Sequence, residues 1–175
     1  RAVTMAAALA ARDYVGDDRE GVLQWALLVL NEAAAVESTE YYRNPQVEYS
    51  NQAIATLGLM QLYVKAPTDP LRNQLLTLST SRDPAVRNAI GRQFTELMAT
   101  APDFVRAVIR VMLTSAAFVR EFDEEAEKGG RVALAPAIAS CLERENTWLA
   151  AGGVEPAWPT LPDWMTRARH GIRIG

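Results

Sequence analysis

One local pattern occurs twice in this chain: a capping residue, then proline, a valine three positions after the cap and a small residue six positions after it. The first copy spans residues 44–50 and the second spans residues 83–89, an offset of 39 residues (83 − 44). Asparagine and aspartate are good helix caps, and proline is favoured at the first helical position. A period of about 40 residues in a helical chain is typical of two-helix units that bury their apolar faces against neighbouring units. The pattern therefore predicts a stacked helical solenoid.

Apolar residues recur at helical spacing along most of the chain, and no segment shows the sustained alternation of a half-buried strand. The expected fold class is therefore all-α, with seven to eight helices. These helices are expected over residues 2–14, 19–36, 46–64, 70–78, 84–99, 103–127, 132–150 and 163–169. The helix over 19–36 has apolar residues around much of its circumference, which predicts a central helix buried on more than one face. The helix over 103–127 is expected to bend near Ser115.

The character of the sequence changes after Gly152 and Gly153. Prolines at positions 156, 159 and 162 make the next stretch too proline-dense for regular structure. We expect one helical domain over residues 1–153 and an irregular tail over residues 154–175 that packs on it or extends from it. The chain begins with Arg1 rather than methionine, so we expect a segment of a larger protein.

Composition and charge exclude several classes of function. The net charge of −3 and the pI near 5.3 make nucleic acid an unlikely partner, because sequence-independent binding to nucleic acid depends on clustered lysine and arginine. The longest apolar run, residues 25–30, is far too short to span a membrane. A single cysteine, Cys141, rules out an internal disulfide bond and favours a cytoplasmic location.

Residues 74–91 resemble a HEAT repeat, in which a short turn ending in aspartate leads into a second helix that begins with valine, arginine and a small residue. The resemblance covers about residues 44–120. It implies that Asp83 caps the second helix and that Arg87 reaches toward a neighbouring acidic group along the stack. The first copy of the pattern has Glu48 where the second has Arg87. The alternative is an irregular helical bundle in which Asn44 and Asp83 are coincidental caps.

The sequence contains no recognisable catalytic, metal or cofactor motif. His170 is the only histidine, which argues against a Ser-His-Asp triad and against paired-histidine metal sites. Cys141 lies among apolar residues, so we expect a core residue rather than a nucleophile. The chain also has no phosphate-binding loop. We therefore expect no catalytic residues, no metal and no cofactor.

An acidic run occupies residues 121–127, where Glu121, Glu124 and Glu125 share one face of the expected helix. These carboxylates could hold a hard cation or carry out carboxylate chemistry. Such a run more commonly marks a solvated helix face, and negative charge near a helix C-terminus hints at a basic partner.

Two groups of aromatic and arginine side chains are candidate partner-binding residues, because these residue types dominate interface hot spots. They are Tyr41, Tyr42 and Arg43 in a predicted loop, and Trp158 and Trp164 in the tail. The alternative for the tryptophans is that they fix the tail to the helices.

The function predicted from these observations is a non-enzymatic scaffold segment for protein–protein interaction. Its partner would be another protein or a neighbouring domain of the same polypeptide. One alternative is a sensor or regulatory segment of a multidomain ATPase. Another is a helical enzyme that uses the acidic run from Glu121 to Glu127.

Overall fold

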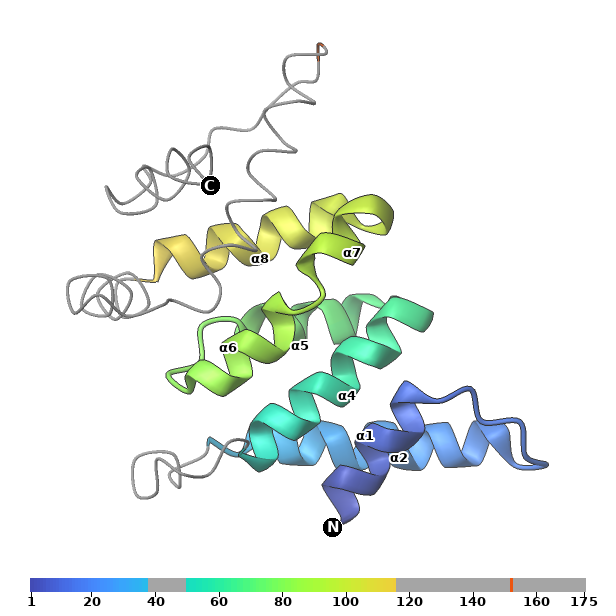
Figure 1. Ribbon diagram of the computed structural model, residues 1–175. Coiled ribbons are helices and arrows are strands. Elements are labelled where there is room, and N and C mark those ends of the chain that lie inside the picture. Colours follow the sequence, from blue (N-terminus) through green and yellow to red (C-terminus); the bar gives the residue numbers. More distant parts are fainter. Residues whose placement is uncertain (38–49, 116–151, 153–175) are drawn as a thin grey trace, which may run out of the picture. The chain divides into compact units, whose positions relative to one another are not determined.

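A computed structural model describes residues 1–37, 50–115 and 152 of the chain, and within these residues it contains seven helices and no strand (Figure 1). The helices are α1 (Ala2–Ala11), α2 (Arg19–Ala35), α4 (Asn51–Lys65), α5 (Asp69–Leu78), α6 (Pro84–Gly91), α7 (Phe94–Thr100) and α8 (Pro102–Thr114). The all-α prediction is thus confirmed for the described part. The helices predicted over 132–150 and 163–169 lie outside it, as does nearly all of the predicted tail.

The chain divides into two compact units between Ile90 and Gly91. The first unit contains α1, α2, α4, α5 and nearly all of α6. In the second unit the structure describes α7 and α8, which pack on each other. The domain boundary predicted at residues 153–154 lies outside the described ranges and stays a prediction.

Three helices of the first unit, α1, α2 and α4, pack pairwise on one another (Figure 1). Much of the buried surface at these contacts comes from alanines, among them Ala6 and Ala10 of α1 and Ala26 and Ala34 of α2. Small side chains allow helix backbones to approach closely, and larger side chains then fill the remaining space. The large residues here include Leu30, Leu59 and Met60, which are fully buried.

Gly58 lies where these three helices come closest. A Cβ atom at this position would lie 2.8 Å from the methyl groups of Leu30 on α2 and 3.1 Å from the Cα of Ala7 on α1. The Ala7 contact is with backbone, which cannot rotate away as a side chain can. A glycine in the middle of a helix lowers helix stability, so its presence here is explained by the close packing.

A chain of buried hydrogen bonds connects the N-termini of α4 and α6. The Ser50 hydroxyl donates to Asp83 Oδ2 at 2.7 Å and also accepts from the Ala53 N–H at 3.1 Å. Asp83 Oδ1 accepts from the Ala85 N–H at 2.8 Å. Ser50 and Asp83 are 4% and 2% exposed, so each helix cap is completed by a partner shielded from water. The prediction that Asp83 caps a helix is confirmed.

Arg87 is also buried, at 3% exposure, and its guanidinium Nη1 donates to the Ser81 carbonyl at 2.6 Å. This bond fastens the turn between α5 and α6 to the first turns of α6. Asp83 and Arg87 therefore stabilise the start of α6 and the turn before it, Asp83 as the cap and Arg87 through the Ser81 carbonyl.

The start of α4 differs from the prediction. The sequence predicted one helix over residues 46–64, capped at Asn44, but α4 begins at Asn51, and its N-cap Ser50 has extended backbone. The caps of α4 and α6 are therefore 33 residues apart (83 − 50), and the cap predicted at Asn44 lies outside the described residues. Serine competes well as a cap because its short hydroxyl accepts from the backbone N–H three residues later.

Two further helices are shorter than predicted. The helix expected over 84–99 is divided into α6 and α7 at Arg92 and Gln93, directly after Gly91, and glycine is a poor helix former. In the helix expected over 103–127, α8 ends at Thr114 and Ser115 has extended backbone, while residues 116–127 lie outside the described residues. The Thr114 hydroxyl donates to the Val111 carbonyl, the kind of local bond with which threonine competes with helix propagation.

We expect Gly58→Val to lower the free energy of unfolding by about 1 to 3 kcal/mol, because the added atoms must push α4 away from α1 and α2. Urea unfolding followed by circular dichroism measures this change. Ala8→Val is the matched control, since Ala8 is an exposed position of α1 and loses only helix propensity, under about 1 kcal/mol. An unchanged unfolding midpoint for Gly58→Val would contradict the close approach described above.

We expect Asp83→Ala to cost about 2 to 3 kcal/mol, more than the 1 kcal/mol typical of a lost cap, because the buried Ser50 hydroxyl also loses its acceptor. Asp69→Ala, at an exposed first-turn position of α5, serves as the control and should cost well under 1 kcal/mol. In a double-mutant cycle, Ser50→Ala and Asp83→Ala should couple by more than about 0.5 kcal/mol. Additive effects would show that the two caps are independent.

Candidate protein-binding surfaces

The partner-binding residues predicted from sequence, Tyr41, Tyr42, Arg43, Trp158 and Trp164, all lie outside the described residues. The same is true of the acidic run at 121–127, of Cys141 and of His170. These assignments therefore stay predictions. The surfaces described below come from α1, α2, α4 and α5, which sequence reasoning had not selected.

Helix α2 is buried on one face rather than on several, which corrects the prediction of a central helix. Its fully or nearly fully buried residues are Ala26, Leu30 and Ala34, on the side where α1 and α4 pack. The large apolar residues Trp25 and Leu28 are 39% and 57% exposed. Apolar residues do occur around much of the circumference of α2, but α1 and α4, the described helices that pack on it, cover one side of this helix.

An apolar stripe lies beside the packed face of α2. We define the outer stripe as Val22, Trp25, Val29, Ala33 and Val36, which follow one another at spacings of three or four residues and so share one helix face. Val36, just past the last helical residue, is 68% exposed, and the other members range from exposed to half-buried. Leu28 borders this stripe. An apolar stripe of this kind normally faces another helix or a core.

A groove of about 750 Å³ opens on another side of α2. Its walls come from the N-terminal half of α2, the C-terminal end of α4 and the loop between α1 and α2. The apolar part of the lining consists of Leu23 and Leu27 of α2, Leu62 and Ala66 from the end of α4, and the ring of Tyr14. We call this feature the α2–α4 groove.

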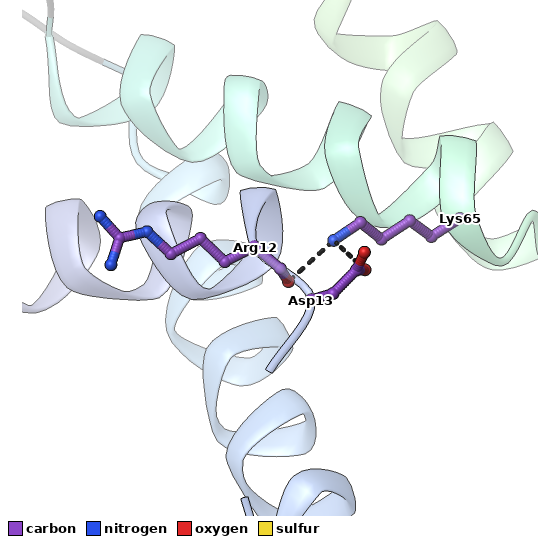
Figure 2. Close-up of polar contacts among 3 residues, drawn as sticks. All are labelled: Arg12, Asp13 and Lys65. Carbon is purple, nitrogen blue, oxygen red and sulfur yellow. Dashed lines mark hydrogen bonds and ion pairs between the residues drawn. The ribbon is translucent and has the colours of Figure 1, made fainter. Parts of the chain in front are cut away.

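Lys65 holds the α1–α2 loop against the end of α4 (Figure 2). Its ammonium Nζ donates to the Arg12 carbonyl at 2.8 Å and lies 3.4 Å from Asp13 Oδ1. Arg12 is the C-cap residue of α1, so the bond satisfies a carbonyl at the helix end, where a cation is also favoured by the helix dipole. The Asp13 side chain is 90% exposed, so its ion pair with Lys65 contributes little compared with the carbonyl contact.

The charged groups at the groove differ in whether they already have partners. The Asp13 carboxylate pairs with Lys65, and Glu20 accepts from the Gln24 amide at 3.3 Å. The guanidinium groups of Arg12 and Arg19 form no hydrogen bond or ion pair within the part of the chain that the structure describes. Figure 2 shows the Arg12 side chain extending away from Lys65. The groove thus combines an apolar lining with two cations that have no partner among the described residues.

A smaller pocket of about 470 Å³ lies between the C-terminal end of α2, the start of α4 and the α5–α6 turn. Its lining combines Leu78 with polar residues such as Thr77, Thr80 and Arg82. Gln52 borders it: its amide Nε2 donates to the Ala34 carbonyl at 2.9 Å, while its buried Oε1 accepts no hydrogen bond from the described residues.

Chemistry beyond binding finds little support in the described residues. No group of three or more His, Cys, Asp or Glu side chains among residues 1–37 and 50–115 is placed to hold a metal ion. Burial raises the pKa of the Tyr63 phenol, with Arg72 lowering it and Asp69 raising it, but Tyr63 borders neither pocket. Nor is any helix in these residues long and apolar enough to span a membrane.

Comparison with known protein families, with curated proteins and with solved structures found no match for this chain.

Replacing Lys65 with methionine should loosen the α1–α2 loop, because the Arg12 carbonyl loses its donor. We expect faster amide hydrogen exchange in residues 13–18, with a loss of global stability of at most about 1 kcal/mol. Asp13→Asn is the control, since it removes the exposed ion pair and keeps the bond from Lys65 to the carbonyl. Equal exchange rates in Lys65→Met and the wild-type protein would show that the loop is held by other contacts.

Proposed function

We propose that this chain is a non-enzymatic module for protein–protein interaction, built from HEAT-like helical repeats, and that the outer stripe of α2 is the surface where a partner docks. The partner is another protein or a neighbouring domain of the same polypeptide. We further propose a cytoplasmic location, as the single cysteine favours.

The observation that carries this proposal is the partly exposed apolar outer stripe, which lies beside the packed face of α2. Trp25, Leu28 and Val36 expose 39%, 57% and 68% of their surface. Contiguous exposed apolar surface of this kind marks interaction sites in folded proteins, and tryptophan is prominent among interface hot spots. In repeat proteins, an apolar face left uncovered by one unit is normally covered by the next.

The HEAT-like proposal draws on the turn between α5 and α6. Asp83 caps α6, as the resemblance implies, and Arg87 lies one turn further along the same helix. The bond from Arg87 to the Ser81 carbonyl closes this turn. Against a strict repeat stands the 33-residue distance between the caps of α4 and α6.

Nucleic acid is not the partner that we propose, because the chain as a whole carries a net charge of −3. The residues Tyr41, Tyr42, Arg43, Trp158 and Trp164 remain candidate contributors to partner binding on the basis of residue type alone.

Quantitative affinity purification from the native host, with the tagged chain as bait, tests this proposal. The variant Trp25→Glu places a charge on the outer stripe, and Leu28→Glu places one beside it. In both, the amount of at least one protein that co-purifies with the wild type should fall by a factor of about 30 or more. Met5→Glu is the control, since Met5 is 56% exposed on α1 and lies outside the stripe. Circular dichroism verifies that each variant is folded.

The proposal is contradicted if Trp25→Glu and Leu28→Glu co-purify with the same proteins as the wild type does. Loss of the same proteins by all three variants would also contradict it, because binding would then not depend on the stripe.

A further inference from the structure

We infer that the α2–α4 groove binds an acidic, amphipathic segment of a partner protein. This inference rests on the proposed function as a protein-interaction module and adds the location and chemistry of a second contact surface.

The walls of the α2–α4 groove carry leucine side chains from two helices. Leu23 and Leu27 are one helical turn apart on α2, and Leu62 faces the same space from α4. The α2 side of the lining runs from Arg19 to Leu27, which corresponds to roughly 12 Å of helix, or about two turns. A wall of this length matches the apolar stripe of a short partner helix with residues at i, i+3 or i+4, and i+7.

Charged side chains also line the α2–α4 groove. The lining contains three cations, Arg12, Arg19 and Lys65, and two carboxylates, Asp13 and Glu20. Lys65 is already occupied by the Arg12 carbonyl and Asp13, whereas Arg12 and Arg19 form no polar contact through their guanidinium groups within the described residues. Three cations against two carboxylates (3 − 2) give the lining a net charge of +1, in a chain whose net charge is −3.

These two observations together select the occupant. Apolar residues on the partner would bury against Leu23, Leu27 and Leu62, and carboxylates beside them would meet Arg12 and Arg19. Arginine suits such contacts because its planar guanidinium can bind a carboxylate through two parallel hydrogen bonds. A basic segment would meet a lining with a net charge of +1, which disfavours it.

A display library of random helical peptides, selected against the full 175-residue chain, tests this inference. We expect selected peptides to carry apolar residues at helical spacing flanked by aspartate or glutamate. Their affinity, measured by fluorescence anisotropy on synthetic copies, should fall by about tenfold or more in the Arg12→Glu/Arg19→Glu variant and on raising the salt concentration. Leu27→Glu should abolish binding.

Arg82→Glu is the matched control, because Arg82 is an exposed arginine of the same unit that does not line this groove. It should leave peptide affinity unchanged. The inference is overturned if the selected peptides lack acidic residues, if their affinity does not depend on Arg12, Arg19 or Leu27, or if no peptide is selected. The alternative occupant of the groove is a second copy of this chain. Concentration-dependent self-association, measured by analytical ultracentrifugation and lost in Leu27→Glu, would assign the groove to that second copy and would also overturn the inference.

The outcomes separate this inference from the proposed function. If native partners depend on Trp25 and Leu28 but no acidic peptide depends on the groove, the inference fails and the proposed function stands. If acidic peptides require the groove but native partners are indifferent to the outer stripe, the groove assignment stands and the stripe is not the docking surface.

Discussion

The close approach of α1, α2 and α4 around Gly58 is the constraint on which the rest of the first unit depends. A side chain at position 58 would collide with Leu30 of α2 and with the backbone of α1 at Ala7. Helices packed this tightly accept mainly alanine on their facing sides, and α2 accordingly turns Ala26 and Ala34 inward. Leu30 lies between these alanines and fills the space beside Gly58. Trp25 and Leu28 lie at other positions around the helix, where they are exposed.

The polar bonds of the first unit hold the remaining elements to this three-helix group. The Ser50–Asp83 bond connects the start of α4 to the start of α6, and the bond from Lys65 to the Arg12 carbonyl connects the end of α4 to the α1–α2 loop. Both ends of α4 are thus tied to other segments. The first bond is buried and the second is partly exposed, so we regard the Ser50–Asp83 bond as the more important for stability and the Lys65 bond as the one that shapes the groove.

Local signals in the sequence predicted the fold class, the bounds of α5 and the cap at Asp83, because proline, capping and helical spacing act over a few residues. The start of α4 at Ser50 and the end of α8 at Thr114 were missed, since serine and threonine compete with the helix through short side-chain bonds that apolar spacing does not reveal. The division after Gly91 had a local signal in the glycine, but the apolar pattern continued across it. The wide apolar face of α2 was recognised, yet periodicity alone cannot tell whether a second helix covers it. The groove could not be predicted, because it joins residues 12–14 to residues 62–68 through tertiary packing.

The central claim is that the outer stripe of α2 is uncovered in this chain and becomes covered by a protein partner. Hydroxyl-radical footprinting read by mass spectrometry measures the reactivity of individual side chains in the isolated chain and in the presence of host proteins. The account predicts that Trp25 and Leu28 are modified readily in the isolated chain, that buried Leu30 and Leu59 are not, and that Trp25 and Leu28 become protected in a partner-bound sample. Protection of Trp25 and Leu28 in the isolated chain, equal to that of Leu30, would contradict it, because α2 would then be a core helix with no free face.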